Sequence, residues 1–142
     1  MSKTIDHIGI AVSDFDAAAD ILGNKLNLHE HEPEEVPDQK VVTLSFSAGG
    51  SEIELLKPAS DESPIAKFIA QKGQGIHHIA LRVDDLQYEL DKLASAGVKL
   101  IDEKPRMGAG GKLIAFIHPK SAGGILIELT QLSEHDKPET DK

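Results

Sequence analysis

Two pairs of polar residues occupy matching positions in the two halves of the chain. His7, in the segment Asp-His-Ile-Gly-Ile, matches His78, in His-His-Ile-Ala-Leu, 71 residues later. Glu54, in Ile-Glu-Leu-Leu, matches Glu128, in Ile-Glu-Leu-Thr, 74 residues later. Hydrophobic packing alone does not explain a histidine or a glutamate inside apolar segments. We therefore expect an internal duplication whose two halves share one metal site near a pseudo-twofold axis.

The donor types suit that expectation. Imidazole and carboxylate groups bind borderline divalent metals such as Zn, Co, Ni or Mn. Glu54 and Glu128 have apolar neighbours on both sides, so each carboxylate would be costly to bury without a cation or a hydrogen-bond donor. Considered one at a time, each histidine is expected to be an ordinary core residue, and each glutamate is expected to point to solvent. Four such residues in matching register favour the metal site.

Composition limits the class of protein. The 142 residues suffice for one compact domain or for two small modules packed as one, and 39% hydrophobic with 27% charged residues is typical of a soluble globular protein. No apolar run reaches the roughly 18 residues that span a bilayer, and no signal peptide is evident, so we expect no membrane association and a cytoplasmic location. The absence of cysteine excludes disulfides and thiolate chemistry. A net charge of −9 and the absence of Trp argue against nucleic acid as a partner.

Hydrophobic periodicity predicts a single domain, residues 1–142, made of two similar modules. The first module, residues 4–60, is expected to hold strands at 4–12, 40–46 and 52–56, a helix capped by Asp14, and a charged loop at 30–35. A linker with a short helix at 61–72 follows. The second module, residues 73–132, is expected to hold strands at 76–83, 98–101, 113–117 and 125–131 and a helix at 86–96. Residues 133–142 are expected to form a frayed tail.

The other histidines carry weaker signals. His29 and His31 fall in the charged loop, where solvent exposure is the ordinary expectation. His77 is adjacent to His78 in a predicted strand, so its side chain is expected to point away from the face of His78. No phosphate-binding or dinucleotide fingerprint occurs, and no nucleophile motif supports a Ser/His/Asp triad.

The paired modules with their four polar residues resemble the vicinal oxygen chelate (glyoxalase/dioxygenase) superfamily, and within it the methylmalonyl-CoA epimerase branch. The resemblance extends over residues 4–131. The stretches that carry it are residues 6–12, 61–68, 75–80, 108–111 and 118–129. The motifs Asp-Glu-Ser-Pro-Ile-Ala and His-Pro-Lys narrow the similarity to the epimerase branch.

The resemblance implies an α+β, glyoxalase-like fold in which two βαβββ modules pair into a cupped mixed sheet. It implies a divalent metal, cobalt first and zinc, manganese or nickel as alternatives, held by His7, His78 and Glu128, with Glu54 at the remaining position. It also implies a homodimer that interconverts (R)- and (S)-methylmalonyl-CoA by removing the α-proton through a metal-stabilised enolate. Glu128 is our candidate base. Glu54 lies opposite Glu128 by the pseudo-symmetry and is our first choice for the second base. Some relatives place a glutamate where this chain has Thr43, so that arrangement is not available here.

Two alternatives stay open. A glyoxalase I-like hemithioacetal isomerase would keep all four ligands and differ in its substrate pocket. A small-molecule-binding protein of the same fold is a different class, and such proteins often lack the ligands that are retained here. The sequence leaves open the native metal, the second base, the contacts of coenzyme A and the oligomeric state.

Overall fold

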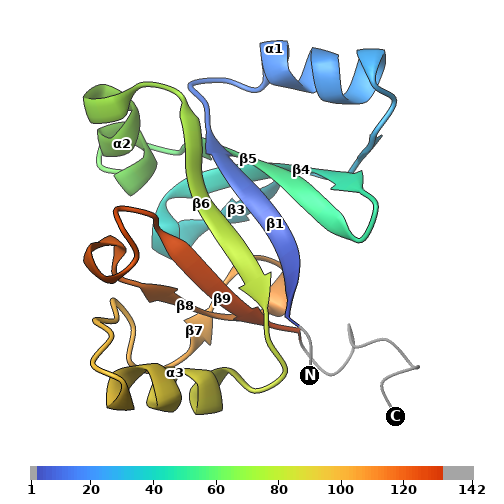
Figure 1. Cartoon of the computed structure of the whole chain (residues 1–142). Coiled ribbons are helices and arrows are strands. Elements are labelled where there is room, and N and C mark those ends of the chain that lie inside the picture. Colours follow the sequence, from blue (N-terminus) through green and yellow to red (C-terminus); the bar gives the residue numbers. More distant parts are fainter. Residues whose placement is uncertain (1–2, 133–142) are drawn as a thin grey trace. The chain divides into compact units, whose positions relative to one another are not determined.

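The computed structural model describes residues 3–132. Within this part the chain forms two compact units (Figure 1). One unit comprises residues 6–78, and the other comprises residues 79–132 together with residues 3–5. None of the helices in the described part is long and apolar enough to cross a membrane.

The unit of residues 6–78 is built on strands joined in the order β2–β4–β5–β1, with β3 also paired to β4. Its strands are β1 (Thr4–Ala11), β2 (His29–Glu30), β3 (Glu34–Val36), β4 (Val41–Ala48) and β5 (Ser51–Pro58). Its helices are α1 (Asp16–Ala19), the π-helical turn η1 (Asp20–Lys25), the 3-10 turn η2 (Pro37–Gln39) and α2 (Pro64–Lys72). The β1–β5 pair is parallel and the β4–β5 pair antiparallel, so the sheet is mixed.

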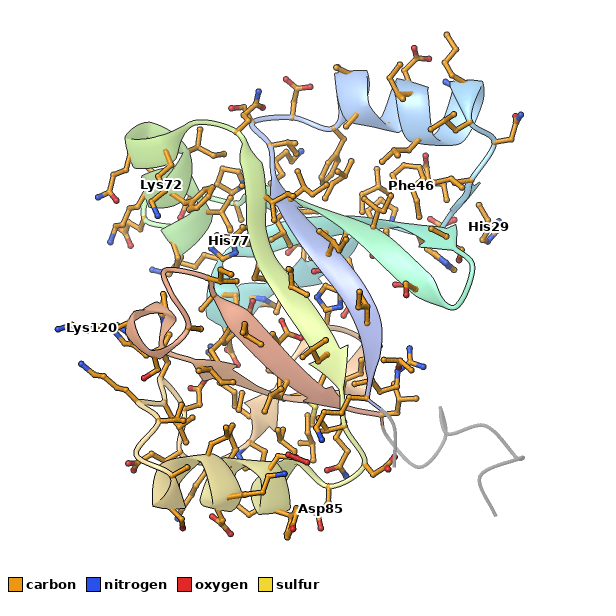
Figure 2. The ribbon with its side chains drawn as sticks, in the orientation of Figure 1. His29, Phe46, Lys72, His77, Asp85 and Lys120 are labelled. Atoms are coloured by element: carbon orange, nitrogen blue, oxygen red, sulfur yellow. The ribbon has the colours of Figure 1, made fainter. Side chains whose placement is uncertain are left out.

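Alternation along the strands divides this sheet into an apolar face and a polar face. Leu44, Phe46 and Leu55 are buried together with apolar side chains of the α1–η1 segment. Figure 2 shows Phe46 on the side of α1. Residues one position along the strands point to the opposite face, and these include the cross-strand partners Glu54 and Ser45.

The second unit begins within β6 (Gly75–Arg82), whose residues 75–78 belong to the first unit. The remaining elements are α3 (Leu86–Ser95), β7 (Arg106–Met107), the 3-10 turn η3 (Ala109–Gly111), β8 (Leu113–Ile117), the 3-10 turn η4 (Pro119–Ser121) and β9 (Ile127–Gln131). The strands are joined in the order β6–β9–β8–β7. Leu86 and Leu90 of α3 are buried against Ala115 and Leu129, which form the core of this unit.

The two units repeat the same strand pairing. In the first, β1 is parallel to β5, and Gly9 is the partner of Glu54. In the second, β6 is parallel to β9, and Ala80 is the partner of Glu128. Gly9 and Ala80 each follow a histidine by two residues, so each glutamate has the same register relative to its histidine strand. The predicted α+β class and mixed, glyoxalase-like sheet are confirmed, whereas the single domain and the module limits 4–60 and 73–132 stay predictions.

Local signals place the helices. The hydroxyl of Ser63 accepts a hydrogen bond from the backbone N–H of Ile65 (3.1 Å) at the start of α2, and Pro64 is suited to that first turn. Asp85 accepts one from Tyr88 (3.1 Å) at the start of α3. Asp14 accepts one from Asp16 (3.0 Å) but is not the cap residue of α1, which is Phe15, so the predicted cap is wrong by one residue.

Three further sequence-based assignments are wrong. Residues 30–35, expected as a loop, contain parts of the short strands β2 and β3, because the edge of β4 offers them hydrogen-bond partners. Residues 98–101, expected as a strand, form only the single bridge of Leu100 to Ile117. The last strand begins at Ile127 and not at residue 125, since the turn that follows η4 continues through Gly124. The tail expected at 133–142 lies outside the described residues.

Candidate metal centre

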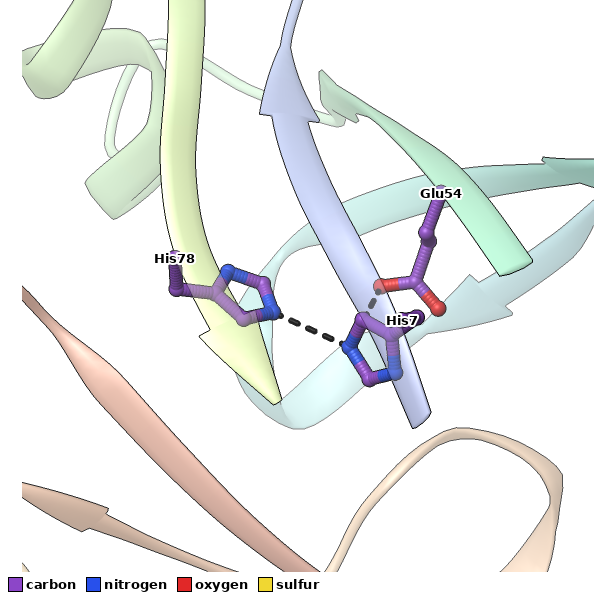
Figure 3. A group of neighbouring side chains, drawn as sticks. All are labelled: His7, Glu54 and His78. Atoms are coloured by element: carbon purple, nitrogen blue, oxygen red, sulfur yellow. Dashed lines mark hydrogen bonds and ion pairs between the residues drawn. The ribbon is translucent and has the colours of Figure 1, made fainter. Parts of the chain in front are cut away.

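Three of the four predicted ligands lie together in the unit of residues 6–78. One donor atom from each of His7, Glu54 and His78 lies within 4.8 Å of the other two. The Nε2 atoms of the two imidazoles are 3.1 Å apart, and Oε1 of Glu54 is 3.6 Å from Nε2 of His7 (Figure 3). Both histidines are 5% exposed, so the cluster is shielded from bulk water.

Each ligand comes from a different strand, and the pleat determines the face. His7 lies on β1, and Gly9 lies two residues further on the same face. Glu54, on β5, is the cross-strand partner of Gly9. A side chain on Gly9 would overlap Cε1 and Nδ1 of His78, so the imidazole of His78 lies directly over this glycine. The missing side chain at Gly9 is what lets the two imidazoles approach.

The outer nitrogen of each imidazole also has a partner. Oδ2 of Asp6 is 2.7 Å from Nδ1 of His7, and Asp6 is 1% exposed. Nδ1 of His77 is 3.0 Å from Nδ1 of His78, although adjacent strand residues start on opposite faces. The prediction that His77 points away from His78 is therefore wrong. The roles of Asp6 and Gly9 escaped the sequence analysis, although both lie in the segment that identifies His7.

The donor set fits a divalent cation. Two imidazole nitrogens and a carboxylate oxygen are the first-shell ligands of many Zn, Co, Ni and Mn sites. Two unprotonated nitrogens at 3.1 Å would repel each other, so their approach requires a shared proton or a cation between them. Hydrogen-bond partners behind metal-binding histidines are a common feature of such sites.

Glu128 belongs to the other compact unit. It is 6% exposed and lies on β9, paired with Ala80 of β6 and with Phe116 of β8. Burial of a carboxylate at this position agrees with the expectation that it does not point to solvent. Its assignment as a metal ligand and as a base stays a prediction.

The remaining histidines of the described part have partners of their own. His29 and His31 are in edge contact, with ring centroids 4.8 Å apart. Nε2 of His31 is 2.7 Å from Oγ of Ser47 and 3.5 Å from Oε2 of Glu52. Its side chain is 40% exposed, which agrees with the expected solvated position. Nδ1 of His118 accepts a hydrogen bond from the backbone of Lys120 and so serves to cap η4.

The chain is similar to known proteins in both sequence and structure. Residues 6–116 match the family described as the Glyoxalase/Bleomycin resistance protein/Dioxygenase superfamily. The ethylmalonyl-CoA/methylmalonyl-CoA epimerase of Cereibacter sphaeroides is 38% identical over 134 residues, which cover 93% of this chain and 100% of the relative. The structure of methylmalonyl-CoA epimerase from Mycobacterium tuberculosis has a TM-score of 0.87 at 38% identity, covering 92% of this chain and 89% of that one. A methylmalonyl-CoA epimerase in complex with methylmalonyl-CoA and NH4+ has a TM-score of 0.89 at 30% identity, covering 97% and 100%.

Proposed function

Because the chain belongs to the Glyoxalase/Bleomycin resistance protein/Dioxygenase superfamily and, within it, to the methylmalonyl-CoA epimerases, we propose that it is a metal-dependent epimerase of methylmalonyl-CoA. The family expected from the sequence is thereby confirmed, as is the expectation of an enzyme. The observation that carries the metal dependence is the convergence of His7, His78 and Glu54 on one point between strands.

The reaction requires removal of a proton from a carbon and its return on the opposite face. That carbon lies between a thioester and a carboxylate, which makes the proton acidic for a carbon acid but far less acidic than a carboxylic acid. A divalent cation held by His7, His78 and Glu54, with Glu128 proposed as a further ligand, supplies Lewis acidity that stabilises charge developing on oxygen. Cobalt is our first expectation, and zinc, manganese and nickel are the alternatives that this donor set accepts.

Two carboxylates are assigned to the proton transfers. Glu128 is proposed as the base that takes the α-proton, and Glu54, its counterpart in the repeat, as the group that serves the opposite face. One carboxylate accepts the α-proton at an oxygen, and the other, protonated beforehand, delivers its own proton on the opposite face, so the two exchange protonation states in each turnover. Thr43, buried on β4, has no group able to act as a base at ordinary pH.

The test is exchange of the α-proton in deuterated water with (R)- and (S)-methylmalonyl-CoA. Wild-type protein loaded with Co²⁺ is compared with chelator-treated protein and with Glu128→Gln and Glu54→Gln. Glu32→Gln, at an exposed site, is the matched control. We expect metal-dependent exchange with loss of stereochemistry in wild type and control. Glu128→Gln should abolish it, and Glu54→Gln should slow the return of the proton on one face.

Absence of exchange in protein that holds its metal would overturn the epimerase assignment. Turnover of a glutathione hemithioacetal under the same conditions would then identify the glyoxalase-like isomerase. Binding of a small molecule without turnover of either substrate would identify the binding-protein alternative. The homodimer remains part of the proposal, and sedimentation of the purified chain measures it directly.

A further inference from the structure

Four polar side chains form a row that runs through the candidate metal centre. Asp6 Oδ2 lies 2.7 Å from His7 Nδ1, and His7 Nε2 lies 3.1 Å from His78 Nε2. His78 Nδ1 in turn lies 3.0 Å from His77 Nδ1. Asp6 is 1% exposed, and His7 and His78 are 5% exposed, so water does not compete for the central contacts.

The row limits where the imidazole protons reside. A neutral imidazole carries one proton, and only its unprotonated nitrogen can bind a cation. An ionised Asp6 can only accept, so His7 donates from Nδ1 and presents an unprotonated Nε2. For His78 to present an unprotonated Nε2 as well, its proton must be on Nδ1 and must be donated to Nδ1 of His77. Only this arrangement leaves both inner nitrogens available to one cation.

We propose that Asp6 and His77 are positioning residues that keep the Nε2 atoms of His7 and His78 unprotonated and directed at a shared divalent cation. This inference rests on the proposed function, in that a cation is the group served. The two residues do not contact that cation. They act through the outer nitrogens of its ligands, which is how carboxylates and other acceptors orient metal-binding histidines and increase their basicity.

Packing holds both positioning residues in place. Asp6 lies on β1 next to His7, so the backbone of the strand fixes the carboxylate beside the ring. The ring of His77 is in edge-to-face contact with Phe68 of α2, with centroids 4.9 Å apart and planes at 81°. Figure 2 shows His77 between β6 and α2. His77 therefore connects the position of α2 to the orientation of His78.

The two positioning residues, Asp6 and His77, differ in their hydrogen-bonding capacity. The carboxylate of Asp6 fixes the tautomer of His7 with or without a cation. His77 is an imidazole and can donate a hydrogen bond as well as accept one. Without a cation, its Nδ1–H can therefore donate a hydrogen bond to His78 Nδ1. His78 Nε2 would then donate to His7 Nε2 across the 3.1 Å contact. Cation binding thus requires His78 and His77 to exchange tautomers, whereas His7 is ready.

The experiment has two readouts on the full-length protein. The first is Co²⁺ affinity, from titration of its visible absorption. The second is the tautomer of each histidine, from long-range ¹H–¹⁵N spectra of ¹⁵N-histidine-labelled protein, metal-free and Zn²⁺-loaded. The variants are Asp6→Ala, Asp6→Asn, which keeps an acceptor oxygen, and His77→Phe, which keeps a ring against Phe68. Asp84→Ala and His29→Phe, at exposed positions, are the matched controls.

We expect Asp6→Ala and His77→Phe each to weaken Co²⁺ binding about 10- to 100-fold, with Asp6→Asn closer to wild type and the controls unchanged. In wild type, His7 should carry its proton on Nδ1 in both states, and His78 should do so only with Zn²⁺. The inference would be overturned if both variants bound Co²⁺ with an affinity within about twofold of wild type. It would also be overturned if His7 of the metal-free wild type carried its proton on Nε2. A wild type that binds no Co²⁺ would instead overturn the proposed function, and the His7 tautomer would then decide the role of Asp6 alone.

Discussion

Gly9 lies on β1 two residues after His7 and is the cross-strand partner of Glu54 on β5. Its Cα is the surface against which the imidazole of His78 lies, because any side chain at this position would overlap the ring. Glycine in the interior of a strand is unfavourable by itself and often marks a close approach of another group. Here the group that approaches is a metal-ligand candidate, which accounts for glycine at a buried strand position.

Replacing Gly9 with alanine should therefore weaken metal binding much more than it weakens folding. We expect Gly9→Ala to displace the ring of His78 and to weaken Co²⁺ binding at least about 10-fold, in the range typical of disturbed ligand orientation. Unfolding by urea should change by only about 1 kcal/mol, because alanine offsets part of the strain by restricting the unfolded chain. Gly50→Ala is the matched control, since nothing lies within 4 Å of its added carbon. Unchanged affinity in Gly9→Ala would show that the ring has room.

The repeat in the sequence was sufficient to find His7, Glu54 and His78, because duplicated residues in matching strands occupy matching registers. The same reasoning failed for His77. Period-two alternation fixes the direction of Cα–Cβ bonds, but it does not fix the side-chain torsions that bring His77 Nδ1 to 3.0 Å from His78 Nδ1. Such contacts depend on the packing of Phe68 from α2, which no local pattern encodes.

The helix α2 begins at a buried cap. Ser63 is fully buried and its hydroxyl accepts from the N–H of Ile65. We expect Ser63→Ala to lower the free energy of unfolding by about 1 to 2 kcal/mol, because the replacement leaves a helix N–H without its acceptor. Urea unfolding of Ser63→Ala beside the exposed control Ser60→Ala measures the difference. Equal losses in the two variants would refute a capping role.

The helix α3 carries a carboxylate whose environment predicts a pH dependence. Partial burial raises the pKa of Glu89, but hydrogen bonds and charges from Lys3 and Lys92 outweigh burial, so the pKa lies below its usual value of 4.5. A lowered pKa means that the ionised group stabilises the folded state above pH 4.5, and that this contribution is lost as the pH falls through the folded-state pKa.

We therefore expect Glu89→Gln to cost about 0.5 kcal/mol near neutral pH, within the range of exposed ion pairs, and progressively less as the pH falls through the folded-state pKa of Glu89. Urea unfolding at neutral and at acidic pH measures this, and 1 M salt should reduce the cost at neutral pH, since the lysines are about half exposed. Glu103→Gln, at an exposed site, should show neither effect. A cost that grows on acidification would contradict the assigned direction.

Long elements were predictable and short ones were not. The strands β1, β4 and β5 and the helices α2 and α3 have clear periodicity and caps, and their observed bounds lie within a few residues of the expected ones. The two-residue strand β2 and the three-residue strand β3 form because each pairs antiparallel with β4. Their sequence, rich in Glu and Pro, carries no strand pattern, so tertiary pairing determines them.

Across the whole chain the duplication is preserved in strand order and register. Each unit places a histidine strand parallel to a glutamate strand, with the glutamate opposite the residue two positions after the histidine. The paired halves were predictable because one pattern occurs twice. The differences between the halves were not predictable. Gly9 lies two residues after His7 but Ala80 lies two residues after His78, and the residues directly before the two histidines are Asp6 and His77. The duplication thus supplies similar ligands with different supporting partners.

A cation that binds only the folded chain must stabilise the fold, which gives a test at the scale of the whole molecule. At a free concentration 100 times Kd, binding adds about 2.7 kcal/mol to the free energy of unfolding. For a chain of this size we expect Tm to rise by about 5 to 10 °C on addition of Co²⁺ and to fall back with a chelator. His7→Ala should abolish the shift, because it removes an imidazole from the cluster, whereas His31→Ala should keep it. If Tm rose by the same amount in His7→Ala, the stabilising cation would bind elsewhere on the chain, and the metal site proposed at His7, Glu54 and His78 would be refuted.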